Sequence, residues 1–196
     1  HLIGIRAPTG RGETIKSGGR VMKNVTGYGF AKLAAGSWGT LGILTEVTYK
    51  LLPMAETEMT LVYEGLDAAR AVDAMTTALG TPFEVTGAAF LPGEPARTLI
   101  RFEGFSASCG YRAGRLSDML AAFGAPERLH DEASQSLWTA IRDVRPLGAT
   151  GSDVVWRISV KPTDGPQVVA RLEAEVSART FLDWSGGLVW AAIDGP

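Results

Sequence analysis

The sequence has few residues that could bind a metal or form a covalent cross-link. Its 196 residues include one cysteine, Cys109, and two histidines, His1 and His130. One cysteine cannot form a disulfide within the chain, and together with two histidines it cannot supply the four ligands of a structural zinc site or an iron–sulfur cluster. We therefore expect no metal centre built by this chain alone, and we expect a cytoplasmic location.

Long hydrophobic runs and dense basic runs are also missing. No stretch approaches the roughly 20 apolar residues that span a membrane. Runs of Lys and Arg interleaved with aromatic residues, which are typical of single-strand nucleic-acid binding, are absent. With 45% hydrophobic and 20% charged residues the chain has the composition of a folded globular protein. We expect no transmembrane segment and no nucleic-acid partner.

Positive charge and glycine are concentrated at the beginning of the chain. Residues 1–52 hold seven Lys and Arg against two Glu, whereas residues 53–196 hold twelve Lys and Arg against nineteen Asp and Glu. Ten of the 24 glycines also lie in residues 1–52. Such a segment can bring backbone N–H groups close to an anion such as a phosphate, or it can be a turn-rich β segment with a solvated basic face.

Hydrophobic periodicity divides the chain near Pro53. Before this residue we expect strands at 2–6, 13–16, 20–23 and 40–52 and a helical turn at 30–35. After it we expect strands at 59–63, 85–91, 98–105, 154–160, 180–183 and 187–193 and helices at 66–79, 106–123, 132–144 and 166–176. This order predicts an α+β fold in which helices cover one face of an antiparallel sheet of the split βαβ kind. The expected domains are residues 1–53 and 54–196.

Two motifs near the beginning of the chain point to nucleotide binding or hydrolysis, and both are incomplete. The run Gly27-Tyr28-Gly29-Phe30 lacks the third glycine of a dinucleotide fingerprint, because Lys32 stands in its place. Ala35-Gly36-Ser37-Trp38-Gly39 is similar to a nucleophile elbow, but a helix is expected before Ser37 and a strand after it, which inverts the order that an elbow needs. A serine hydrolase that uses Ser37 remains an alternative.

Glycines recur at three-residue spacing around this serine. Gly36, Gly39 and Gly42 keep side chains away from one edge of the backbone. A flat or anionic group could then approach main-chain N–H groups closely, and a β-bulge or a crossing of two sheets would require the same pattern.

A longer pattern contains these glycines. Residues 18–28, GGRVMKNVTGY, are followed by Lys32-Leu33 and by residues 36–46, GSWGTLGILTE. This pattern resembles the second half of the FAD-binding domain of vanillyl-alcohol oxidase/PCMH-type flavoproteins, and within that superfamily it resembles the FAD-binding E subunit of bacterial glycolate oxidase. Weaker similarities follow at Leu137-Trp138 with Arg142, at residues 156–160 and at residues 186–190.

The resemblance implies a fold, a cofactor and a set of binding residues. Residues 1–53 would be the second part of a PCMH-type FAD-binding domain, and residues 54–196 a ferredoxin-like antiparallel-sheet cap domain. FAD would be the cofactor, and the following residues would lie along it: Asn24, Thr26, Gly27, Gly36, Ser37, Trp38, Gly39, Thr40, Leu41, Gly42, Ile43 and Leu44. The first half of the family's domain precedes this pattern, so we expect the chain to be a fragment that binds FAD weakly or not at all in isolation.

The resemblance also implies an activity and partners. The chain would act in a glycolate oxidase complex that oxidises glycolate, or a similar small 2-hydroxy acid, to glyoxylate by hydride transfer to the flavin. Arg142 and Arg157 are the candidates for binding the substrate carboxylate, since a guanidinium matches a carboxylate. No catalytic base is assigned, because His1 is terminal and His130 stands among charged residues.

The implied partners are a second flavin-containing subunit and an iron–sulfur subunit, which could hold the chain at the periphery of the inner membrane. A non-catalytic electron-relay or assembly subunit of the same complex is the alternative, and the lack of an evident base favours it.

Overall fold

The computed structural model describes residues 1–21 and 28–195 and consists of two compact units, His1–Met54 (unit 1) and Ala55–Pro196 (unit 2). Asn24, Thr26 and Gly27, which the resemblance places beside the cofactor, lie outside the described residues. Within the described residues, no helix has both the length and the apolar character needed to cross a membrane.

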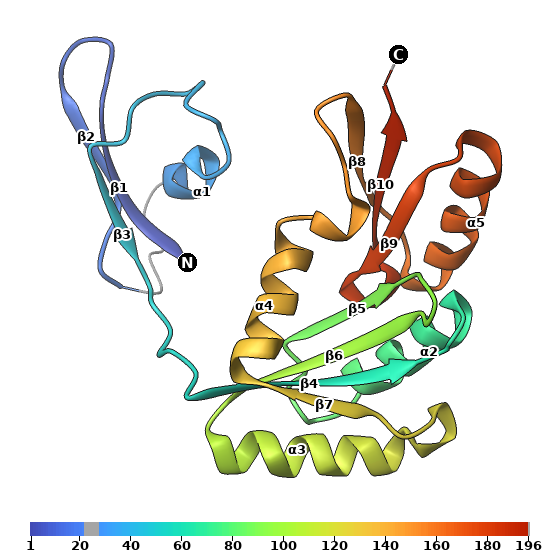
Figure 1. The fold of residues 1–196 in the computed structure, drawn as a ribbon. Helices are drawn as coiled ribbons and strands as arrows, with labels where there is room; N and C mark the ends of the chain where they lie inside the picture. Colours follow the sequence, from blue (N-terminus) through green and yellow to red (C-terminus); the bar gives the residue numbers. More distant parts are fainter. Residues whose placement is uncertain (22–27, 196) are drawn as a thin grey trace. The chain divides into compact units, whose positions relative to one another are not determined.

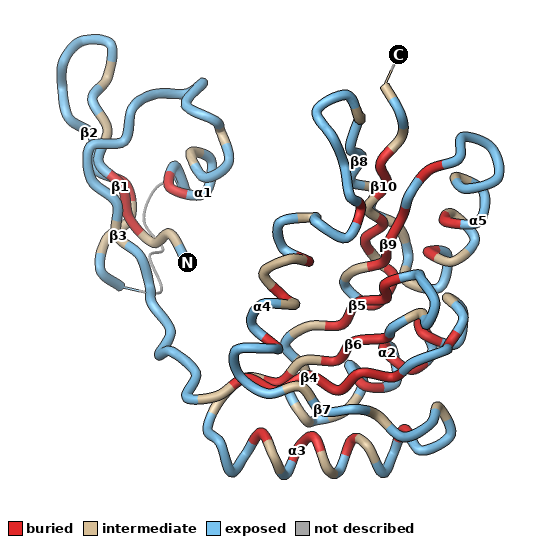
Figure 2. Tube along the Cα trace, in the orientation of Figure 1, coloured by how far each residue is buried: buried red, intermediate tan, exposed pale blue. Residues whose placement is uncertain are grey.

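Unit 1 is a small antiparallel sheet with one short helix. Its strands are β1 (Leu2–Pro8), β2 (Thr14–Gly18) and β3 (Glu46–Tyr49), and its helix is α1 (Phe30–Ala34). The strand order is β2-β1-β3, and α1 contacts β1 and β2 (Figure 1). Most of the described part of unit 1 is exposed, and its buried hydrophobic residues there are Ile5 and Ala31 (Figure 2). A layer this thin has little core of its own.

The strand expected at 40–52 is much shorter than its alternating pattern indicates. Only Glu46–Tyr49 pairs, with β1, and residues 40–45 lie outside helix and strand. Gly39 and Gly42 have φ values of +77° and +146°. These glycine conformations turn the chain away from the extended path that a strand requires, so the alternation up to residue 45 does not correspond to a sheet.

Unit 2 is built on a seven-stranded sheet in which every paired neighbour is antiparallel. The strand order is β7-β4-β6-β5-β9-β10-β8. The strands are β4 (Thr57–Glu64), β5 (Gly87–Leu91), β6 (Arg97–Gly104), β7 (Glu127–His130), β8 (Asp153–Ser159), β9 (Arg179–Asp183) and β10 (Leu188–Asp194). The helices are α2 (Ala68–Leu79), α3 (Ser106–Met119), α4 (Asp131–Arg142) and α5 (Gly165–Val176).

Four short 3-10 helices complete unit 2: η1 (Ala121–Phe123), η2 (Arg145–Leu147), η3 (Pro162–Asp164) and η4 (Trp184–Gly186). The run from β4 to β7 follows the β-α-β-β-α-β order of the split βαβ motif, and β9, β10 and β8 extend its sheet beyond β5. The predicted α+β class is confirmed.

The helices of unit 2 cover both faces of its sheet. The larger apolar cluster joins α2, α3 and α5 to one face, through residues such as Met75, Leu116 and Val169. A second cluster joins α4 to the opposite face, where Trp138 and Ile141 pack beside strand residues. The expectation that helices cover one face is therefore wrong for α4. Helical periodicity identifies the apolar side of a helix but does not select the sheet face that it covers.

Candidate functional site

The glycine loop, which we define as residues 36–44, connects α1 to β3 in unit 1. Gly36, Gly39 and Gly42 all have positive φ, and a Cβ atom added to any of them would meet no heavy atom within 4 Å. Glycine is needed at these positions for backbone conformation and not because neighbouring atoms crowd them. The backbone of the loop is therefore open to an approaching group.

The side chains of the glycine loop present an exposed apolar surface. Trp38 is 96% exposed, Ile43 73% and Leu41 62%, while Leu44 is 39% exposed and Ser37 is half-buried. The hydroxyl of Thr40 donates to the backbone oxygen of Ser37 at 2.7 Å and stabilises the turn between them. Open backbone beside large apolar side chains fits a flat aromatic ring with polar edges, such as a flavin.

Ser37 does not occupy a nucleophile elbow. It follows α1, and its backbone N–H donates to the carbonyl oxygen of Ala34 at 3.1 Å, which continues the end of the helix. A helix thus precedes Ser37 and irregular chain follows it, whereas an elbow places its serine between a strand and a helix. The structure gives the hydrolase alternative no support.

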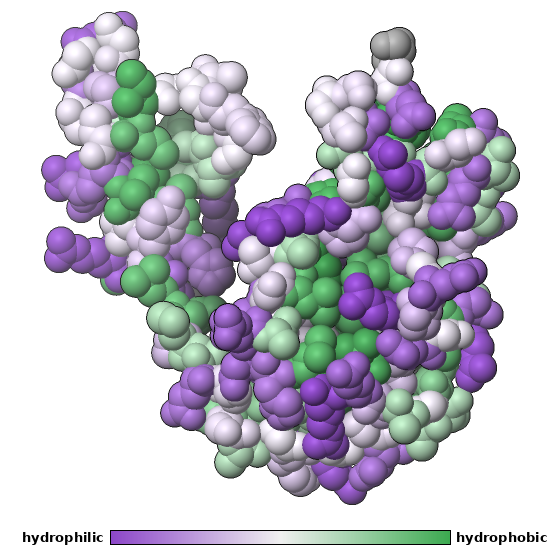
Figure 3. Space-filling model, viewed as in Figure 1, coloured by the Kyte–Doolittle hydropathy of each residue, from purple (hydrophilic) through white to green (hydrophobic). Residues whose placement is uncertain are grey.

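Unit 2 contains a pocket of about 570 Å³ on the sheet face that α4 partly covers. In the space-filling view of this side, apolar residues of unit 2 are exposed and hydrophilic residues border them (Figure 3). The lining residues come from β4, α2, the chain before β5, β5, β6, α4 and the β9–η4 junction: Glu58, Leu79, Val85, Thr86, Gly87, Ala88, Arg101, Gln135, Trp138, Thr139, Ile141, Arg142, Asp183 and Trp184. Its charged groups lie around an apolar interior, as in many small-molecule sites.

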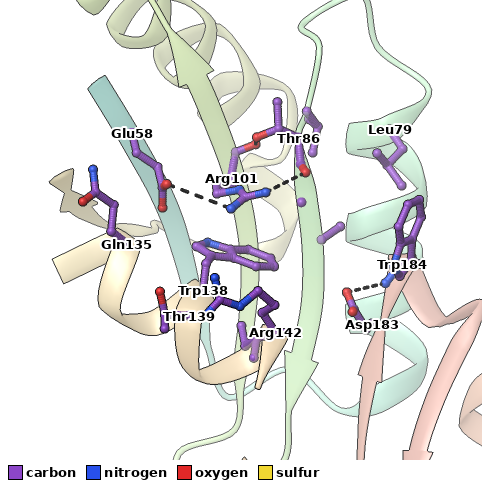
Figure 4. A pocket seen from close by; sticks show the side chains of 14 residues that line it. Glu58, Leu79, Thr86, Arg101, Gln135, Trp138, Thr139, Arg142, Asp183 and Trp184 are labelled. Carbon is purple, nitrogen blue, oxygen red and sulfur yellow. Dashed lines mark hydrogen bonds and ion pairs between the residues drawn. The ribbon is translucent and has the colours of Figure 1, made fainter. Parts of the chain in front are cut away.

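Arg142 lines this pocket from the end of α4 (Figure 4). Its Nε atom donates to Asp143 Oδ1 at 2.9 Å, a hydrogen bond that raises the pKa of Arg142 above its usual value. The Arg142 side chain is 73% exposed, so its guanidinium remains accessible to an anion. Asp143 also accepts from Arg145 Nη2 at 2.8 Å, but Arg145 does not line the pocket.

The second predicted arginine, Arg157, lies elsewhere in unit 2. It is exposed on β8, the last strand of the sheet, and its guanidinium lies 5.9 Å from the ring centre of Trp190. Arg157 is not among the residues that line the pocket. Burial raises the pKa of Asp183, and the positive charge of Arg157 offsets only part of this effect. The structure therefore brings Arg142 into the pocket and leaves Arg157 outside it.

A chain of buried hydrogen bonds fixes one wall of the pocket. Trp138 Nε1 donates to Thr60 Oγ1 at 2.8 Å, and Ser134 Oγ donates to Glu58 Oε1 at 2.6 Å. The hydroxyls of Thr60 and Ser134 are 2.6 Å apart. Because the Ser134 proton points to the carboxylate, the Thr60 hydroxyl must donate to Ser134. The chain therefore runs in one direction, from the indole to Glu58.

Arg101 connects the two ends of this chain. Its guanidinium lies 4.7 Å from the ring centre of Trp138, and its Nη1 atom is 4.0 Å from Glu58 Oε2. Gly87 lies opposite Arg101 on the neighbouring strand. A Cβ atom at Gly87 would come within 2.9 Å of Trp138 Cη2 and 3.2 Å of Arg101 Nε. The absence of a side chain there allows both large groups to lie against the sheet.

Asp183 lies across the pocket from α4 (Figure 4). Burial raises the pKa of this carboxyl, and the opposing effects are smaller: the backbone hydrogen bond from Trp184, the charges of Arg101 and Arg157, and a side-chain hydrogen bond from Trp190. The Trp184 N–H donates to Asp183 Oδ1 at 2.7 Å. Among the described residues Asp183 has no ion pair within 4.0 Å. This carboxylate has lost water without gaining a cationic partner in contact.

The sequence did not single out Asp183, Arg101 or Glu58. They come from β9, β6 and β4, and only the sheet order brings them to one pocket. One signal was present: Asp183 ends a strand and is followed directly by Trp184, and a polar residue at a strand end is a frequent position for a functional side chain.

Comparisons with known proteins support the resemblance seen in the motifs. No family model matches the chain. The chain is 29% identical to the glycolate oxidase subunit GlcE of Escherichia coli K12 over 189 residues, which cover 96% of this chain and 47% of GlcE. It is 45% identical to GlcD, a glycolate oxidase subunit of Bacillus subtilis, over 71 residues, which cover 35% of this chain and 15% of GlcD. An FAD-linked oxidoreductase of Mycobacterium tuberculosis is 45% identical over 53 residues, 27% of this chain and 12% of that protein.

Solved structures agree with the fold. Two structures of alkyldihydroxyacetonephosphate synthase match with TM-scores of 0.62 and 0.67 at 16% and 15% identity. They cover 100% and 97% of this chain, and the chain covers 45% of each. The chain is thus a relative of FAD-linked oxidoreductases, and its resemblance to the PCMH-type flavoproteins is confirmed. Within them its similarity to GlcE extends over almost the whole chain, which spans about half of the length of that subunit.

Proposed function

We propose that this chain is part of the FAD-binding subunit of a glycolate oxidase complex that acts on glycolate or a similar small 2-hydroxy acid. The observation that carries the proposal is the similarity to GlcE over 96% of the chain, which includes both the glycine loop and the pocket of unit 2. The other relatives include a second glycolate oxidase subunit and a D-lactate dehydrogenase, both named for 2-hydroxy acids.

The glycine loop is the proposed FAD contact. Its open backbone can donate N–H groups to the polar edge of the ring system, and Trp38, Leu41 and Ile43 can cover an apolar surface of the cofactor. The same proposal includes Asn24, Thr26 and Gly27, which lie outside the described residues. Bound FAD would supply the hydride acceptor for oxidation of the substrate carbon.

The pocket of unit 2 is the proposed substrate site. Arg142 is its accessible cation, and a guanidinium pairs with a carboxylate through two parallel hydrogen bonds. Arg157 is proposed to act only at longer range, because it lies outside the lining and its charge only partly offsets the burial that raises the pKa of Asp183. No histidine lines the pocket within the described part of the chain, so the alternative of an electron-relay or assembly subunit retains its support.

A spectroscopic experiment tests the function. The protein is produced together with the two proposed partners, a second flavin subunit and an iron–sulfur subunit, and glycolate is added without oxygen. We expect the flavin absorbance to bleach, and Arg142→Ala to raise the KM for glycolate at least tenfold because a charge-assisted pair is lost. Arg145→Ala is the matched control, since it breaks an ion pair with the same Asp143 outside the pocket.

Three results would count against parts of this proposal. A complex without flavin would contradict the cofactor. If the flavin of the complete complex stays oxidised when glycolate is added, the proposal that glycolate is the substrate is contradicted. Bleaching that is insensitive to Arg142→Ala would remove that residue from the site. For the 196-residue chain by itself we propose weak FAD binding or none, and no turnover, and stoichiometric flavin on the purified chain would overturn this.

A further inference from the structure

The pocket of unit 2 contains one acidic group that neither a structural network nor an ion pair accounts for. Glu58 accepts from Ser134 and lies near Arg101, so its oxygens have partners. Asp183 accepts a hydrogen bond on Oδ1 from the N–H of the next residue, and the side chain of Trp190 is a weaker second donor that slightly lowers its pKa. A carboxylate offers about four acceptor positions on its two oxygens, so the half-buried Asp183 keeps acceptor positions available to a ligand.

The location of this carboxylate defines what the ligand must carry. Asp183 and Arg142 line the same pocket from opposite sides, from the end of β9 and from the last turn of α4 (Figure 4). Gly87 and Ala88 of β5 also line the pocket and carry no large side chain that would fill it. A molecule that satisfies both groups needs an anionic end for the guanidinium and a hydrogen-bond donor for the carboxylate.

We propose that Asp183 is the specificity-determining residue of this pocket, where it accepts a hydrogen bond from the hydroxyl group of a hydroxy acid whose carboxylate is held by Arg142. The inference rests on the proposed function for the class of substrate, and it adds how the site distinguishes that class from acids that lack the hydroxyl. A simple carboxylic acid would satisfy Arg142 but would give Asp183 no donor beyond those that the protein already supplies.

The burial of Asp183 makes this discrimination effective. Asp183 is half-buried, and partial burial raises its pKa by more than the Trp184 and Trp190 hydrogen bonds and the charges of Arg101 and Arg157 lower it. A ligand hydroxyl restores one hydrogen bond to the carboxylate, whereas an apolar group in that place displaces water and gives nothing back. Hydrogen bonds to buried polar groups discriminate strongly against analogues that lack the donor.

The test compares glycolate with acetate, which has the same carboxylate but no hydroxyl. Affinities of both acids for the full chain are measured by isothermal titration calorimetry or by NMR chemical-shift titration, with no flavin required. We expect the protein to bind glycolate at least tenfold more tightly than acetate, the ratio that about 1.5 kcal/mol of hydrogen bonding to a charged group gives. Asp183→Ala should reduce this ratio below twofold and should not weaken acetate.

Two further variants keep the result interpretable. Asp183→Asn retains an oxygen that can accept the Trp184 N–H, so it preserves the local turn while it removes the charge, and it should also lower the ratio. Asp118→Ala is the control, because Asp118 is exposed on α3, which packs on the other face of the sheet, and it should leave both affinities unchanged.

The inference is overturned if wild-type protein binds neither acid, if it binds both equally, or if the glycolate preference persists in both Asp183 variants. These outcomes differ from a failure of the proposed function. If glycolate bleaches the flavin of the complex but the Asp183 variants leave the ratio of glycolate to acetate affinity unchanged, the proposed function stands and this role of Asp183 is refuted. Conversely, selective binding that depends on Asp183, without bleaching, would support the role and contradict the oxidase.

Discussion

Removing the hydroxyl of Ser134 should destabilise unit 2 more than any other single hydroxyl loss on α4. Ser134 is fully buried and connects Thr60 to Glu58. In Ser134→Ala the Glu58 carboxylate loses a charge-assisted hydrogen bond, worth about 1.5–3 kcal/mol. The Thr60 hydroxyl loses its acceptor while Trp138 still donates to it, and a buried unsatisfied group costs about 1–3 kcal/mol. The higher helix propensity of alanine compared with serine offsets about 0.5 kcal/mol of this loss.

The expected net loss of unfolding free energy is therefore about 3 kcal/mol, or roughly 6–12 °C in Tm for a chain of this size. Ser136→Ala is the matched control, because it makes the same chemical change at an exposed position of the same helix. Urea denaturation followed by circular dichroism gives both free energies from the midpoints at equal slope. A difference between the two variants below about 1 kcal/mol would refute the reasoning about the buried chain.

Two further predictions concern Gly87 and the acidic groups. Gly87→Ala should lower the free energy of unfolding by about 1–3 kcal/mol, because the added methyl group overpacks against Trp138. Gly110→Ala lies inside α3, where the methyl group meets no atom within 4 Å, and it should stabilise the protein by about 1 kcal/mol. Thermal unfolding of both variants checks the opposite signs. Asp183→Asn and Asp131→Asn should respond to pH in opposite directions in the same assay. Burial raises the pKa of Asp183, so the protonated carboxyl contributes to stability below the unfolded pKa, and this contribution is lost as pH rises through the folded pKa. Asp183→Asn should therefore increase the free energy of unfolding more at pH 8 than at pH 4. Hydrogen bonds lower the pKa of Asp131, so its carboxylate contributes to stability above the unfolded pKa, and this contribution is lost as pH falls through the folded pKa. Asp131→Asn should therefore reduce the free energy of unfolding more at pH 7 than at pH 3. Equal pH profiles of the two variants would contradict both assignments.

Sequence patterns predicted unit 2 well because its elements carry strong periodicity. The helix expected at 166–176 is α5, Gly165–Val176, and the strand expected at 154–160 is β8, Asp153–Ser159. The strand β7, Glu127–His130, was missed because Leu129 is its one apolar residue. It lies at the edge of the sheet and pairs only with β4, so its side chains need little burial. Its sequence therefore lacks the alternation of apolar and polar residues that would predict a strand.

The candidate site was predicted in part for a related reason. Arg142 could be named because it stands in a motif, whereas Asp183 and Arg101 are linked only through the strand order. Strand order depends on long-range pairing, which local periodicity does not encode. The residues of the glycine loop could be named from the motif that resembles the flavoproteins. Their irregular conformation could not be predicted, since the same alternation of apolar and polar residues occurs in true strands.

Hydrogen bonds, and not apolar contacts alone, hold the helix that carries the proposed binding residue Arg142. Ser134, Trp138 and Arg142 follow one another at four-residue spacing and therefore share one side of α4. Apolar contacts are non-directional and tolerate a small rotation or slide of the helix, whereas the bonds from Ser134 to Glu58 and from Trp138 to Thr60 fix both its rotation and its register. Arg142 lies one turn beyond Trp138, so the geometry of the chain sets where its guanidinium stands. Ser134→Ala should accordingly weaken the binding of both glycolate and acetate even below its unfolding temperature, while Ser136→Ala should not, and unchanged affinities in a folded Ser134→Ala protein would show that Arg142 is positioned by other contacts.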